Sequence, residues 1–138
     1  MTRHVYGFED RYLTTLADLN KQQSLRVLVS QAKKIWRKHY SGSRAIPTIK
    51  FGKGDSSLGR PLSYTLGYSE IVLCPKQRNL LTLIHELVHA IGPCQHGRNF
   101  VKVYVTILDD FVKDKHVMNK IHNEFSNHHK RLYNRHYK

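Results

Sequence analysis

The chain has 138 residues, of which 40% are hydrophobic and 24% charged, as is typical of one globular domain with a modest core. It contains neither an apolar run near the roughly 18 residues of a membrane span nor, in MTRHVYGFEDRYL, the apolar segment of a secretory signal, so we expect a single domain over 1–138 in a soluble, intracellular protein (cytoplasmic or nucleoid-associated). The 23 Lys and Arg against 10 Asp and Glu, a net charge of +13, make DNA or a nucleoprotein the expected partner.

Two helices are expected over residues 8–40. Apolar residues recur at helical spacing over 8–20, and again over 24–40, where Ser24 is a suitable N-cap. The polar side of this second helix carries four cations, Lys33, Lys34, Arg37 and Lys38. The helix should end near Tyr40, because the loop-forming sequence SGSRAIP follows.

The segment 46–74 predicts a small three-stranded sheet. IPTIKFGKG reads as one short strand, and LSYTLGYSEIVLC reads as two strands separated by Gly67. β-Branched and aromatic residues are frequent here, and Pro75 ends the last strand.

A third helix is predicted over 78–91, with Asn79 as a cap and Gly92–Pro93 as its end. Apolar residues cover almost every face of it, which is typical of a helix at the centre of a core. Two C-terminal helices are expected over 98–134, although the β-branched run VKVYVTI also fits a strand. The predicted fold class is therefore α+β.

The core helix carries three polar residues, His85, Glu86 and His89, within its apolar run. The two histidines are four residues apart, so they project from one face and can grip one metal ion. Glu86 lies about 100° round the helix and can reach a water on that metal without ligating it. This HExxH arrangement predicts one zinc ion, with Glu86 as the general base of amide hydrolysis.

Zinc in a catalytic site needs a third protein ligand, and His96 is the best candidate because Gly92 and Pro93 let the chain turn back. Cys94 is a weaker alternative. The group that would stabilise the oxyanion is not evident from the sequence, and Tyr104 and Tyr64 are the two candidates.

These residues resemble a known family. Residues 46–112 are similar to the SprT-like zinc metallopeptidases, the group that includes Spartan and its compact Wss-type relatives, in the segments IKFGKG, YSEIVLC, LIHELVHA and HGRNF. The resemblance implies a minimal zincin in which a small sheet and flanking helices surround the HExxH helix. It matches His85, His89 and His96 to the zinc ligands and Glu86 to the catalytic glutamate. Metzincins are the second choice, because Gln95 stands at the position of their third ligand.

The resemblance also implies proteolysis of protein substrates at or near DNA. In zincins the strand before the active helix commonly binds the substrate, which here would make YSEIVLC the edge strand. Phosphate contacts would come from two basic groups: Lys33, Lys34, Arg37 and Lys38 in the second helix, and Lys130, Arg131 and Arg135 near the end. The alternative is a basic nucleic-acid-binding or structural module, whose zinc site would be closed by a fourth protein ligand such as Cys94.

Overall fold

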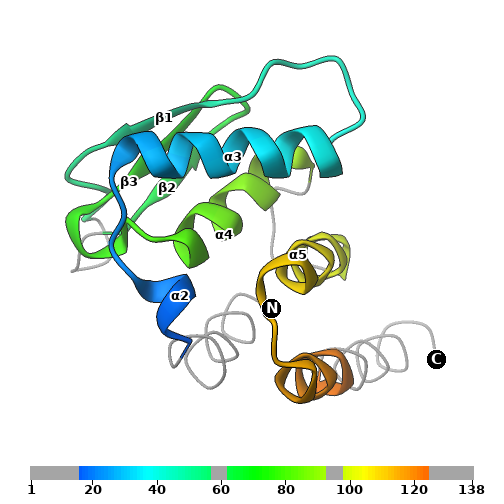
Figure 1. The fold of residues 1–138 in the computed structure, drawn as a ribbon. Helices are drawn as coiled ribbons and strands as arrows, with labels where there is room; N and C mark the ends of the chain where they lie inside the picture. The colour runs from blue at the N-terminus through cyan, green and yellow to red at the C-terminus, as the bar shows by residue number, and fades with distance from the viewer. Residues whose placement is uncertain (1–15, 57–61, 93–97, 125–138) are drawn as a thin grey trace.

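The computed structural model describes residues 16–56, 62–92 and 98–124. It contains helices and a small sheet, which confirms the α+β class (Figure 1). One cluster of buried side chains extends from Leu19 to Ile121, so the described elements share a core. None of the helices in these ranges is long and apolar enough to cross a membrane.

The N-terminal part of the described chain is helical. Of the first predicted helix, residues 8–15 lie outside the described part, and the remainder contains the short helix α2, Ala17–Asn20. The second predicted helix is confirmed as α3, Leu25–His39, whose first turn is capped by the Ser24 side chain accepting a hydrogen bond from the Val27 amide at 3.2 Å. Its apolar stripe buries Leu28, Ala32 and Ile35.

The predicted three-stranded sheet is present and comprises β1, Thr48–Phe51, β2, Tyr64–Leu66, and β3, Glu70–Leu73. Its order is β1-β3-β2, in which β1 runs parallel and β2 antiparallel to β3. Gly67, with φ +57°, forms the turn between β2 and β3, because a left-handed conformation is strained for most other residues.

The sequence-based choice of edge strand was wrong. The segment YSEIVLC contains β3, which pairs on both sides and is the central strand, whereas β2 is the edge strand antiparallel to it. The physical reason is burial. Ile71, Val72 and Leu73 are all buried, as suits a strand covered on both faces and flanks, whereas Tyr64 and Leu66 of the short β2 are exposed.

The predicted core helix is confirmed as α4, Leu80–Ile91, which lies between α3 and α5 (Figure 1). A short 3-10 turn, Pro75–Gln77, precedes it. The Asn79 side chain caps the helix by accepting from the Thr82 amide at 2.8 Å, and Gly92 is the C-cap. Eight of its twelve residues are buried. Each fully buried leucine or isoleucine among them contributes about 1.5–3 kcal/mol of apolar burial.

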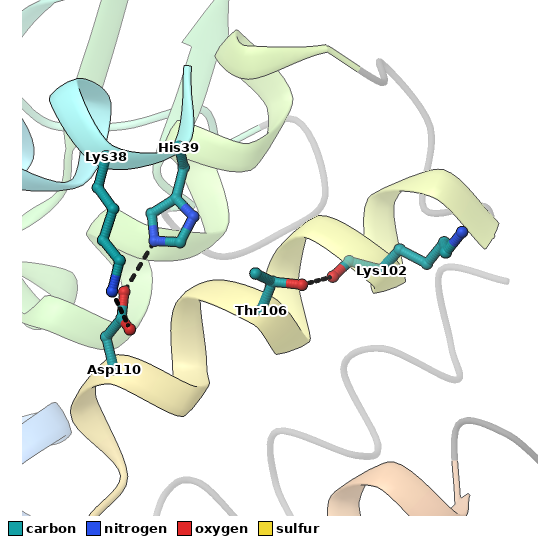
Figure 2. A network of polar contacts seen from close by, with 5 residues as sticks. All are labelled: Lys38, His39, Lys102, Thr106 and Asp110. Atoms are coloured by element: carbon teal, nitrogen blue, oxygen red, sulfur yellow. Dashed lines mark hydrogen bonds and ion pairs between the residues drawn. The ribbon is translucent and has the colours of Figure 1, made fainter. Parts of the chain in front are cut away.

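Residues 98–111 are helical, which excludes the strand alternative for VKVYVTI. They form α5, Arg98–Phe111, and a further helical segment follows over 115–124. α5 is tied to the end of α3 by Asp110, which accepts hydrogen bonds from Lys38 at 2.6 Å and His39 at 2.8 Å (Figure 2). The rest of the last predicted helix lies outside the described residues.

Candidate metal centre

His85 and His89 lie one turn apart on the face of α4 that meets α5. Their ring centroids are 5.2 Å apart. The side chain of His85 is 4% exposed, and His89 is half-buried. The structure therefore brings together the two imidazoles that the HExxH spacing predicted, at a separation that suits two ligands of one ion.

Two aromatic residues of α5 pack on these imidazoles. The ring centroid of Phe100 lies 5.1 Å from that of His85 and 4.7 Å from that of His89. The Tyr104 ring meets His85 edge-on at 5.8 Å and also contacts Phe100. Both aromatic side chains are almost completely buried. This packing restricts the rotation of both imidazoles, as is required of residues that must present ring nitrogens to a common point.

Glu86 is the buried acid beside these histidines, with an exposed fraction of 6%. Its side chain turns toward β2, where the hydroxyl of Thr65 lies 2.7 Å from Oε2 and 3.0 Å from the main-chain oxygen of Glu86. A buried carboxylate is costly unless it is hydrogen-bonded. Thr65 was not identified from the sequence, because its partner is 21 positions away.

The candidate third ligands, His96 and Cys94, lie outside the described residues. Within the described ranges no group of three or more His, Cys, Asp or Glu side chains is placed to hold a metal. The donors at α4 are nevertheless chemically suited to zinc, since two neighbouring imidazoles on one helix turn are a common half of a zinc site. Cys74 lies elsewhere, buried near Ser63 and Gln77.

The two tyrosines considered for oxyanion stabilisation occupy different environments. Tyr104 is 1% exposed and lies beside His85, whereas Tyr64 is 37% exposed. Because side chains alternate along a strand, Tyr64 lies on the face of β2 opposite to Thr65 and thus opposite to Glu86. The placement disfavours Tyr64.

Arg44 is a further residue at this helix that the sequence did not single out. Its Nη2 donates to the main-chain oxygen of Ile91 at 3.1 Å, at the C-terminal end of α4. Its guanidinium stacks on the Tyr68 ring at 3.8 Å, and its Nε donates to the Tyr40 hydroxyl at 3.1 Å. A cation at this end complements the helix dipole where α4 leads into the segment carrying Cys94 and His96.

The basic residues of α3 are placed on the surface. Lys33, Lys34 and Arg37 are exposed. Lys38 is exposed as well, but it is ion-paired with Asp110, so a phosphate contact there would compete with an existing interaction. The second basic group, Lys130, Arg131 and Arg135, lies outside the described residues.

No protein-family model matches the chain, and no curated protein or solved structure was found to be similar to it.

Proposed function

We propose that the chain is a zinc-dependent endopeptidase of the SprT-like type, with a minimal zincin architecture. The observation that carries the proposal is the placement of His85, Glu86 and His89 on a buried helix. Two imidazoles lie on one face of it, and the carboxylate lies next to them on the side of the edge strand β2. A glutamate so placed can serve as the base beside a hydrolytic metal, whereas a purely structural zinc site does not require one.

His85 and His89 would hold the zinc ion together with His96. When bound, zinc supplies Lewis acidity, which makes a water molecule easier to deprotonate and a substrate carbonyl easier to attack. Phe100 and Tyr104 keep the two imidazoles oriented by packing against them. Open access to one side of the ion is the feature that separates this proposal from a closed, structural site.

Glu86 would act as the general base. Its carboxylate would accept a proton from the attacking water and then donate it to the leaving amine. Burial makes the electrostatic influence of the carboxylate on its neighbours stronger than it would be in water. The substrate would be a polypeptide.

The enzyme would act on its substrates at or near DNA. The support for this is the net charge of +13 and the exposed cations Lys33, Lys34 and Arg37 on α3. Contacts between such side chains and phosphates are tolerant of nucleotide sequence, which suits an enzyme that meets its substrates at many places on DNA.

The test is cleavage of an unfolded protein by the wild type and by Glu86→Gln, with zinc content measured, in the presence and absence of single-stranded DNA. The matched control is Glu70→Gln, which alters a glutamate that is ion-paired with Lys50 on the sheet. We expect all three proteins to hold one zinc and Glu86→Gln alone to lose cleavage. If wild type and Glu86→Gln both hold zinc and neither cleaves, a basic nucleic-acid-binding module with structural zinc replaces the proposal.

A further inference from the structure

One row of side chains across the sheet has an unexpected polar member. The register aligns Thr65 of β2 with Ile71 of β3, and Ile71 with Ile49 of β1. Ile71 and Ile49 are 0% and 7% exposed, so this row faces the core. Valine or isoleucine in place of Thr65 would have a strand propensity that is equally high. A hydroxyl facing the core requires a hydrogen-bonding partner to offset its desolvation.

That partner is Glu86. The Thr65 hydroxyl lies 2.7 Å from Oε2, within the short range of hydrogen bonds from a hydroxyl to a charged carboxylate, and 3.0 Å from the main-chain oxygen. A hydroxyl has a single proton, and the shorter distance to the charged acceptor favours donation to Oε2. β-Branching limits the rotation of the Thr65 side chain, and β2 itself is held by its pairing with β3.

We infer that Thr65 is a positioning residue for Glu86. By holding Oε2 from the edge strand, Thr65 sets the plane of the carboxylate and therefore the direction in which Oε1 points. This inference rests on the proposed role of Glu86 as a base. The competing explanation is that Thr65 ties β2 to α4 through the main-chain oxygen alone, in which case its loss would affect stability and not catalysis.

The variant that separates these explanations is Thr65→Val, which keeps the shape and the strand propensity and removes the hydroxyl. Thr65→Ser keeps the hydroxyl. Thr48→Val is the matched control, since Thr48 is an exposed threonine on the opposite edge strand, β1. All are compared with the wild type for zinc content, kcat and KM. The rotamer of the Glu86 side chain is followed by NMR scalar couplings in the metal-free protein, a readout that needs neither zinc nor activity.

We expect Thr65→Val to bind one zinc and to lose about tenfold in kcat, the loss of one hydrogen bond to a charged group, with KM within about twofold of wild type. Its Glu86 couplings should become averaged over rotamers. Thr65→Ser should recover most of kcat and the single rotamer, and Thr48→Val should match the wild type in both.

Three results would overturn the inference. If Thr65→Val retains both kcat and the single rotamer, Thr65 does not position Glu86, while the peptidase proposal stands. If Thr65→Ser is as impaired as Thr65→Val, the threonine acts through packing. If the wild type itself does not cleave, the proposed function fails and the catalytic role of Thr65 fails with it.

Discussion

Replacing Phe100 by leucine should weaken zinc binding more than it weakens the fold. Phe100 is fully buried and touches both histidines and Tyr104. Leucine keeps much of the apolar volume but loses the three ring contacts. The cost in unfolding free energy should be about 1–2 kcal/mol, because each aromatic pair contributes about 0.5–1.5 kcal/mol beyond area burial and leucine recovers part of it.

The loss in zinc affinity should be larger, because replacing a residue that orients metal ligands typically lowers metal affinity by about 10–100-fold. The matched control is Ile107→Val in the same helix. Ile107 is also fully buried, and the change costs about 0.5–1.5 kcal/mol. Thermal unfolding of the metal-free proteins gives the stability, and competition with a zinc chelator gives the affinity. Equal affinity losses in the two variants would refute the view that Phe100 orients the imidazoles.

Three further outcomes are expected. Asn79→Ala removes the cap of α4 and should lower the unfolding free energy by about 1 kcal/mol in chemical denaturation, and an unchanged midpoint would contradict the capping role. Burial raises the pKa of Asp110, but hydrogen bonds from Lys38 and His39 outweigh burial and lower the pKa below 3.8, so the stabilisation from these contacts should be complete above about pH 4 and be lost as the pH falls through the lowered pKa. Asp110→Asn should lower the unfolding free energy by about 0.5 kcal/mol at neutral pH and flatten the dependence of stability on acid pH. An unaltered pH dependence would contradict this role of Asp110. Neutralising Lys33, Lys34 and Arg37 together should weaken single-stranded DNA binding and reduce the slope of log affinity against log salt by about 2, whereas neutralising the exposed Lys113, Lys115 and Lys120 should not.

Local signals in the sequence predicted the helices well. Ser24 and Asn79 cap the helices that they were expected to cap, and Gly92 ends α4. These features succeed because a cap or a helix end depends on residues a few positions apart. Gly67 likewise marks the turn between two strands, and its left-handed conformation explains why glycine stands there.

The order of the strands in the sheet is harder to predict from the sequence. The continuous apolar run of Ile71, Val72 and Leu73 in β3 is itself a signal of a buried, central strand. The expectation that this strand lies at the edge follows the usual arrangement in zincins and not this local pattern. The order β1-β3-β2 depends on pairing between segments that are far apart in sequence, which the strand patterns alone do not specify.

For the candidate site, spacing predicted the pair of histidines because helical periodicity places residues four apart on one face. The supporting residues depend on tertiary packing. Thr65 approaches Glu86 from β2, and Arg44 reaches the end of α4 from the loop after α3. Neither approach leaves a pattern within its own segment, so both became visible only in the folded chain.

The proposed function requires that His85, His89 and His96 hold zinc with one coordination position open. X-ray absorption at the zinc edge of the metal-loaded protein tests this directly. We expect three imidazole nitrogens and one exchangeable oxygen around the zinc, at about 2.0–2.1 Å. A sulfur ligand at about 2.3 Å, or a fourth protein ligand in place of the oxygen, would contradict it, because such a closed site has no place for the water that Glu86 is proposed to deprotonate.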